Sequence, residues 1–276
     1  MRPAEIELPA SLGSIAVRWL GAAGFAIKHD GHVLLIDPYL TRAPLWRCLS
    51  SPLRPDEAAL ERHVPRADAI VLGHTHFDHA LDTPALARRT GALVFGSSSC
   101  ASLCAAAGVP AAQIREPRET EVGPFRLRFF GSAHSRLLLG RVPFPGDISD
   151  CEQVPLRAHR YRCGAVFGIE VEVAGKHIVH LGSAELAEAK PARREVDLLL
   201  LCVAGWQSSH DLPERVARAL SPHTVLLSHW DDFLAPLEKP ARMLPAMQMA
   251  RLVDRLDKAT GEARIGTLPL LGETRL

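Results

Sequence analysis

Three histidines and an aspartate within six residues constrain this chain more than any other feature. They lie in the stretch Leu72-Gly73-His74-Thr75-His76-Phe77-Asp78-His79. The apolar run 68–72 before it predicts a buried strand, so the cluster is expected on a strand-to-helix loop. In an extended loop alternate side chains point the same way, so His74 and His76 can reach one ion while Asp78 and His79 turn towards a second. Neutral imidazole and carboxylate suit zinc, and also manganese or iron.

Strands and helices are expected to alternate along the chain, which is typical of the α/β class. Strands are predicted over 15–20, 25–28, 32–36, 68–72, 92–95, 125–130, 165–173, 177–181, 196–203, 224–228 and 264–270, and helices over 56–62, 81–89, 98–107, 212–220 and 242–259. A further short helix is expected after Glu185, and Asp211 is expected to cap the helix over 212–220. Asp30-Gly31 predicts a two-residue hairpin turn, because both positions tolerate positive φ.

The chain has 276 residues and 47% hydrophobic content, which favours one domain over 1–276. A net charge of +1 gives no global field for nucleic acid or a membrane surface. No signal peptide and no apolar run of membrane-spanning length are apparent, so a cytoplasmic location is expected. The oligomeric state is left open. The cysteines lack a Cys-x-x-Cys pair and are expected as reduced, mostly buried thiols: Cys48, Cys100, Cys104, Cys151, Cys163 and Cys202.

Two more residues at predicted strand ends are candidates for the same site. His134 follows the strand over 125–130, and a third nitrogen would complete the first ion's ligands. Asp37 ends the strand over 32–36, where Pro38 stops the sheet. Asp37 either caps a turn or holds a metal ligand in place by a hydrogen bond, and both alternatives stay open here.

The pattern resembles the metallo-β-lactamase-fold metallohydrolase superfamily over nearly the whole chain. The resemblance rests on His74-x-His76-x-Asp78-His79, then His134 after a later strand, and His229 after the last buried strand, in that order. Three stretches are most similar to the branch with L-ascorbate 6-phosphate lactonases and N-acyl-phosphatidylethanolamine-type phospholipases D: Trp19-Leu20-Gly21-Ala22-Ala23-Gly24-Phe25, Leu35-Ile36-Asp37-Pro38 and Ser228-His229-Trp230-Asp231.

The resemblance implies a four-layer αβ/βα sandwich with the metals at one end, between the two sheets. It assigns the first metal to His74, His76 and His134, and the second to Asp78, His79 and His229. It also implies a metal-dependent hydrolase that binds one or two zinc ions, with Mn²⁺ or Fe²⁺ as alternatives. A bound divalent ion lowers the pKa of its water towards about 7, which generates hydroxide at neutral pH. Asp78 is the candidate catalytic residue, because it can relay a proton to the departing oxygen.

The chain departs from the family pattern at one position. Members with two metals usually bridge them with an aspartate in a Gly-Asp-Thr-like turn, whereas this chain has Gly182-Ser183-Ala184. A neutral hydroxyl cannot offset two dications, so a second ion is expected to bind weakly or not at all. Glu185 either replaces the missing carboxylate or lies at a helix N-terminus.

The substrate class is less constrained by the sequence. The segment 136–162 contains five arginines after His134, which favours an anionic small molecule unless Asp147, Asp150 and Glu152 neutralise them. The target is an ester-like bond, either a lactone or a phosphodiester, since both need an activated water. The alternative is a non-catalytic metal-binding or ligand-sensing protein, silenced at Ser183.

Overall fold

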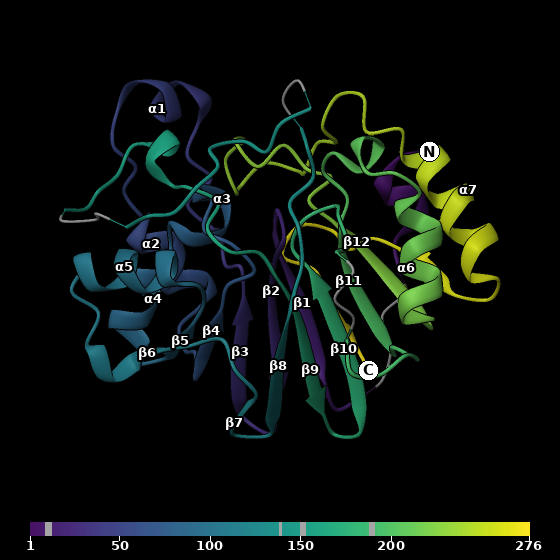
Figure 1. Cartoon of the computed structure of the whole chain (residues 1–276), viewed down its shortest axis with the longest axis horizontal. Coiled ribbons are helices and arrows are strands. Elements are labelled where there is room, and N and C mark those ends of the chain that lie inside the picture. The colour runs from purple at the N-terminus through teal and green to yellow at the C-terminus, as the bar shows by residue number, and fades with distance from the viewer. Residues whose placement is uncertain (9–12, 138–139, 150–152, 188–190) are drawn as a thin grey trace.

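Two seven-stranded mixed sheets face each other and carry helices on their outer faces (Figure 1). The computed structural model describes residues 1–8, 13–137, 140–149, 153–187 and 191–276. Helices α2, α4 and α5 cover the first sheet, and α6 and α7 cover the second (Figure 1). The four-layer αβ/βα sandwich expected from the sequence is confirmed.

The first sheet has the strand order β14-β1-β2-β3-β4-β5-β6. Its strands are β1 (Ala16–Gly21), β2 (Gly24–His29), β3 (His32–Ile36), β4 (Ala69–Val71), β5 (Leu93–Phe95), β6 (Ile114–Arg115) and β14 (Glu273–Arg275). The pairs from β14 to β3 are antiparallel and those from β3 to β6 are parallel. The helices of this half are α1 (Leu45–Ser50), α2 (Glu57–His63), α3 (Phe77–Ala80), α4 (Thr83–Thr90) and α5 (Ser98–Ala106).

The second sheet has the order β13-β12-β11-β10-β9-β8-β7. Its strands are β7 (Thr120–Val122), β8 (Phe125–Gly131), β9 (Phe167–Val173), β10 (Lys176–Leu181), β11 (Leu198–Cys202), β12 (Thr224–Ser228) and β13 (Arg264–Gly266). Helices α6 (Leu212–Leu220) and α7 (Met249–Thr260) pack beside it. Short 3-10 helices are formed by Pro3–Ile6, Ala111–Gln113, Ala158–Arg160 and Trp206–Ser208.

Successive side chains of a strand point to opposite faces of the sheet, so one sheet packs against a layer on each side. Leu34 and Ile36 of β3 belong to the core cluster shared by both sheets, whereas Leu35 packs in the cluster under α2, α4 and α5. All five residues of β11 are buried, as its apolar run predicts for a central parallel strand. The hairpin turn at Asp30 and Gly31 is also confirmed, with φ of 45° and 75°.

Several sequence expectations for local structure were wrong. Helix α7 begins at Met249 rather than 242, because the segment 242–248 contains Pro245 and lines a cavity. No helix follows Glu185 up to residue 187, and β13 ends at Gly266 rather than 270. Asp211 is the N-cap residue of α6, as expected, but its side chain makes no capping hydrogen bond and pairs with Arg255 at 3.0 Å instead. The sequence analysis also did not predict α1, α3, β6, β7 and β14.

No helix in the described part of the chain is long and apolar enough to cross a membrane. The single domain over 1–276 and the cytoplasmic location stay predictions. The five cysteines that the structure describes are free thiols, and four of them are buried. Cys151, Asp150 and Glu152 lie outside the described residues, so their expected roles stay predictions as well.

Candidate metal centre

The candidate ligands follow strands whose carboxyl ends meet at one end of the sandwich. In the first sheet Asp37 follows β3, and His74 to His79 follow the parallel strand β4. In the second sheet His134, Ser183 and His229 follow β8, β10 and β12, which run in the same direction. The two sheets therefore each contribute part of one site.

His74, His76 and His134 form the first group, with one ligand atom from each within 4.8 Å of the others. Nε2 of His74 lies 3.1 Å from Nδ1 of His76. Nε2 of His76 donates to the carbonyl oxygen of Pro143 at 2.8 Å, and Nδ1 of His134 donates to that of Ser135 at 2.7 Å. Because these outer nitrogens hold the protons, the inner nitrogens of His76 and His134 keep their lone pairs for a ligand.

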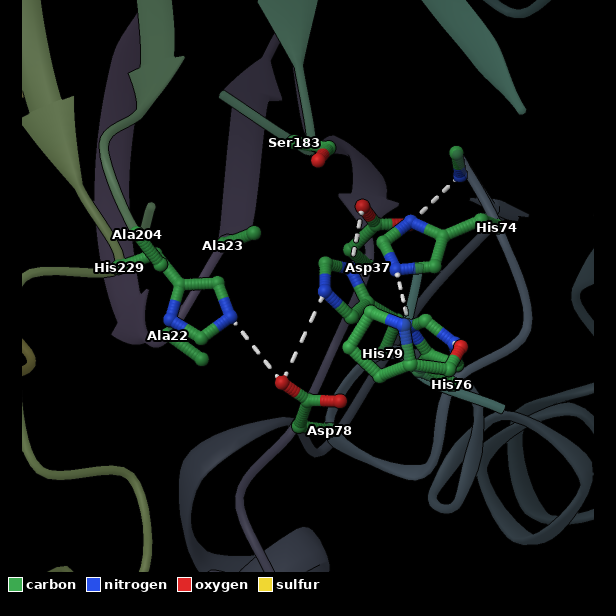
Figure 2. Close-up of polar contacts among 12 residues, drawn as sticks. Ala22, Ala23, Asp37, His74, His76, Asp78, His79, Ser183, Ala204 and His229 are labelled. Carbon is green, nitrogen blue, oxygen red and sulfur yellow. Dashed lines mark hydrogen bonds and ion pairs between the residues drawn. The ribbon is translucent and has the colours of Figure 1, made fainter. Parts of the chain in front are cut away.

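Asp78, His79 and His229 form the second group, also with ligand atoms within 4.8 Å (Figure 2). Oδ2 of Asp78 lies 3.0 Å from Nε2 of His229 and 3.9 Å from Nε2 of His79. Asp78 and His79 sit on α3 of the first half, whereas His229 enters from β12 of the second. This group therefore spans the interface between the two halves.

Asp37 fixes the loop and one of its histidines together. Oδ2 accepts a hydrogen bond from Nδ1 of His79 at 2.8 Å, and Oδ1 accepts one from the backbone of Gly73 at 2.7 Å (Figure 2). A Cβ at Gly182 would lie 2.5 Å from Asp37 Oδ2, so only glycine fits there. The two sequence alternatives for Asp37 hold at once, because it caps the loop and orients an imidazole.

Burial keeps the imidazoles of the first group uncharged. It holds the pKa of His74 well below its ordinary value and lowers the pKa of His76. It also lowers the pKa of His134 to about 4, helped by the positive charge that His76 would carry. All three are therefore neutral at pH 7, which is the form that binds a metal ion.

The second group pairs an anion with imidazoles. Burial alone would raise the pKa of Asp78, but His79 and His229 more than offset this and hold it below its usual range. Burial alone would lower the pKa of His79, yet Asp37 and Asp78 raise it. The carboxylate of Asp78 thus stays ionised and supplies a negative charge facing the two imidazoles.

Ser183 and Glu185 are placed differently from one another. Ser183 is buried, and its Oγ accepts a hydrogen bond from the backbone N–H of Ser135 at 3.0 Å. It therefore supports the turn that carries His134. Oε1 of Glu185 instead pairs with Arg215 at 2.7 Å, and Glu185 is absent from the candidate ligand groups of the described residues. The structure gives Glu185 no geometry for replacing a bridging carboxylate.

Three further side chains, His180, His210 and Trp206, are absent from the candidate ligand groups of the described residues. Nε2 of His180 donates to the carbonyl oxygen of Ala23 at 2.9 Å, and the side chain of His210 is 91% exposed. Trp206 is buried and donates to the carbonyl oxygen of Met247 at 2.8 Å.

A cavity of about 660 Å³ opens over both groups. Its lining includes the candidate ligands His76, Asp78, His79, His134 and His229, and many apolar side chains. Among the described residues the lining contains no arginine or lysine. Arg136, Arg141, Arg157 and Arg160 are exposed, and Arg157 donates to the carbonyl oxygen of Ser50. The arginine segment therefore gives the expected anionic substrate no support.

The donor set fits a divalent metal ion. Histidine and aspartate are ligands for zinc, manganese and iron. The first group presents neutral imidazoles, and Asp37 and Asp78 add carboxylates. The structure also shows supports that the sequence reading missed, such as the carbonyl oxygen of Pro143 and the buried ion pair of Arg42 with Asp231 at 2.8 Å. These contacts join residues far apart in sequence, so no local motif reveals them.

Comparisons with known proteins agree with this geometry. A family model described as "Beta-lactamase superfamily domain" matches residues 16–229. A UPF0173 metal-dependent hydrolase from Anaeromyxobacter sp. (strain K) is 27% identical over 248 residues, covering 87% of this chain and 83% of its own length. Another from Cupriavidus taiwanensis is 36% identical over 214 residues, covering 75% of this chain and 70% of its own length.

The solved structure of Igni18, a metallo hydrolase from Ignicoccus hospitalis, superposes with a TM-score of 0.58 at 16% identity, covering 94% of this chain and 97% of that one. This likeness shows the fold. The branch suggested by the sequence stays a prediction. Since the family model covers strands β1 to β12 and every candidate ligand, the chain belongs to the metallo-β-lactamase superfamily.

Proposed function

We propose that this protein is a metal-dependent hydrolase that cleaves an ester-like bond in a small molecule. The observation that carries the proposal is the convergence of two groups of ligand side chains on one cavity. The relatives in Anaeromyxobacter and Cupriavidus are described as metal-dependent hydrolases, which supports the same reaction class here.

In this proposal His74, His76 and His134 hold the first ion, and Asp78, His79 and His229 hold the second. We propose zinc, with manganese or iron as alternatives that the same ligands accept. A divalent cation at this position supplies an activated water at neutral pH and a positive charge for the attacked oxygen. Pro143, Ser135 and Asp37 keep the imidazoles of His76, His134 and His79 in the tautomers that this requires.

Asp78 has a second proposed role as the proton carrier of the reaction. Its carboxylate lines the cavity and its Oδ2 faces two imidazole nitrogens. A carboxylate that binds an ion through one oxygen can accept a proton from the attacking water at the other oxygen and return it to the departing oxygen. Its lowered pKa makes it a weak base, so we expect it to hold the proton only briefly.

The number of tightly held ions follows from Ser183. Two carboxylates, Asp37 and Asp78, occur in the candidate groups of the described residues. Asp37 is already bonded to His79 and Gly73, so Asp78 is the carboxylate left for an ion. We therefore propose a first ion that binds tightly at the three histidines and a second that binds more weakly. The non-catalytic alternative is not favoured, since a silenced site places no demand on His79 and His229.

Metal content and turnover together test the proposal. Purified protein is dialysed against zinc and analysed by elemental mass spectrometry, then assayed on chromogenic esters, lactones and phosphodiesters. His76→Ala should lose the first ion and its turnover, whereas His210→Ala, at an exposed histidine outside the cavity, should keep both. Unchanged metal content in His76→Ala, or no specific metal in the unaltered protein, would exclude the proposed site.

A further inference from the structure

The walls of the cavity over the candidate metal centre are apolar and carry aromatic rings. The apolar lining comes from two loops and the end of α3, and consists of Phe77, Leu137, Pro143, Phe144, Phe233, Leu244, Pro245 and Met247. The polar side chains of the described lining, apart from the candidate ligands, are uncharged or weakly polar: Ser135, Ser183, Cys202, Gln207, Ser208 and Gln248. Asp78 is thus the one carboxylate among the described lining residues.

Two phenylalanines of the lining each contact an imidazole of a different candidate ligand group. The ring of Phe144 meets that of His76 edge-on, with centroids 6.4 Å apart and planes at 84°. The ring of Phe233 meets that of His229 in the same way, at 5.1 Å and 88°. Each candidate ligand group therefore has a phenyl ring against one of its imidazoles, and both rings line the cavity.

Part of this apolar wall is exposed, which a protein core does not explain. Phe144 is 36% exposed and Leu137 is 43% exposed, and both border the cavity. Large apolar side chains left at the mouth of a cavity mark a surface for a ligand. Backbone bonds hold the wall in place, since the carbonyl oxygen of Phe144 accepts from Cys163 N–H at 2.9 Å and that of Pro143 accepts from His76.

Apart from the candidate metal ligands, the described lining of the cavity offers no charged side chain that could pair with a charged substrate. The arginines of the segment 136–162 are absent from the described lining, and so are all lysines. An ionised group held against these walls would lose its water without gaining an opposite charge. An alkyl or aryl group would gain free energy there instead, because its apolar surface leaves water.

We propose that the substrate is a neutral carboxyl ester or lactone with an alkyl or aryl substituent, and that the walls around Phe144 and Phe233 bind this substituent. The inference rests on the proposed hydrolase function and narrows it, because it favours a carboxyl ester or lactone over an anionic phosphodiester. Phe144 and Leu137 determine specificity at the mouth. The reacting carbonyl lies between the two ligand groups, and the substituent extends along the apolar lining.

The test uses zinc-loaded protein and pairs of substrates that differ in one group. The 4-nitrophenyl esters from acetate to octanoate should show kcat/KM rising by about fourfold per methylene until the cavity is filled. In 4-nitrophenyl 7-sulfoheptanoate a sulfonate, a poor zinc ligand, replaces the terminal methyl group of the octanoate. Its kcat/KM should be lower by about a hundredfold or more, because the charge has no partner in the walls.

Variants locate the effect in the cavity. Phe144→Arg should lower the ratio of kcat/KM for the octanoate ester to kcat/KM for the sulfonate ester at least tenfold, because the new guanidinium can pair with the sulfonate. The matched control Leu49→Arg adds the same charge at a 75% exposed leucine of α1 outside the cavity and should leave the preference unchanged. An equal effect of both variants would overturn the assignment of the walls.

The outcomes separate this inference from the proposed function. Turnover without chain-length dependence, equal rates for the methyl and sulfonate esters, or a preference for bis(4-nitrophenyl) phosphate would overturn the inference and leave the hydrolase standing. If no ester is cleaved, calorimetric titration of the zinc-loaded protein with octanamide and 7-sulfoheptanamide decides the point. Tighter binding of octanamide that Phe144→Arg weakens supports the apolar walls, and equal binding overturns them.

Discussion

Replacing Arg42 with methionine should destabilise the protein and selectively weaken the second ligand group. The side chains of Arg42 and Asp231 are 1% and 0% exposed, and Nη1 of Arg42 lies 2.8 Å from Oδ2 of Asp231. Arg42 also donates from Nε to the carbonyl oxygen of Ala235 at 2.7 Å and from Nη2 to that of Asp232 at 2.6 Å. One guanidinium thus satisfies three acceptors inside the fold.

The magnitude follows from what the substitution leaves behind. Without Arg42, the Asp231 carboxylate keeps one described partner, the backbone N–H of Ala22 at 3.1 Å. Removing one member of a buried ion pair strands the other charge and costs about 3 to 5 kcal/mol. Methionine fills much of the same volume, so the expected loss is electrostatic rather than a packing defect.

The expected effect on the metal site comes from the chain connection. His229 lies two residues before Asp231, has φ of 58°, and donates its backbone N–H to the carbonyl oxygen of Ala22 at 2.8 Å. The same Ala22 N–H bonds to Asp231, so the pair holds the loop that positions His229. Arg42→Met should therefore weaken binding of a second ion and leave the ion at the three histidines in place.

The assay is urea-induced unfolding of metal-free protein, followed by metal titration of the folded variants. Lys258→Met removes an exposed pair with Asp254 on α7 and should change the free energy of unfolding by less than about 0.5 kcal/mol. In a double-mutant cycle, Arg42→Met combined with Asp231→Asn should cost less than the sum of the single changes. A loss below about 1 kcal/mol for Arg42→Met, or strict additivity, would refute the buried-charge argument.

Three further changes test two parts of the site and one buried carboxyl group outside it. Ser183→Asp should raise the number of tightly held zinc ions towards two by elemental mass spectrometry, and an unchanged count would contradict the role given to the missing bridge. Asp37→Asn should weaken the second ion by about 10- to 100-fold in a competition titration, because an amide has one acceptor oxygen and no charge where the carboxylate accepts from both His79 and Gly73; equal weakening at the first ion would count against this. Burial raises the pKa of Asp82 to about 6. The fold therefore favours its protonated form, and the stability it contributes is complete well below its ordinary pKa of 3.8 and is lost as pH rises through 6. Relative to Asp82→Asn, the unaltered protein should lose about 2 kcal/mol of unfolding free energy between pH 4 and 7, measured in urea, and parallel pH profiles would exclude this.

Local sequence patterns predict the parts of the fold that depend on neighbouring residues. Apolar alternation locates β3 and β9, and an uninterrupted apolar run locates β11. Turn chemistry at Asp30 and Gly31 fixes the hairpin between β2 and β3. The ligand segment after β4 is recognisable for the same reason, because its histidines and aspartate lie within a few residues of a strand end.

The parts that escaped prediction depend on contacts between distant residues. Strand β14 has three residues and exists because β1 pairs with it across the whole chain. The segment 242–248 has helical spacing, yet it forms a cavity wall, where Leu244 donates its backbone N–H to the carbonyl oxygen of Trp230 at 2.8 Å. Glu185 is bonded to Arg215, thirty residues further on. No periodicity in the sequence records such partners.

The two candidate ligand groups differ in the contacts that align their side chains. In the first group, His74 and His76 come from one loop, and the backbone carbonyl oxygens of Pro143 and Ser135 orient two of its rings without any charge. The second group takes Asp78 and His79 from one sheet and His229 from the other, and charged contacts align it on both sides: Asp37 on His79, and Arg42 through Asp231. Because His134 follows β8 of the second sheet, both groups take ligands from both sheets. A shift of one sheet against the other therefore changes the geometry of the first group as well as that of the second. An ion bound at the second group should in turn strengthen the docking of the two halves, because ligand binding to the folded state raises the free energy of unfolding. The resistance of the zinc-loaded protein to urea should accordingly rise with occupancy of the second group, and it should do so less in Arg42→Met, where the alignment of His229 is lost.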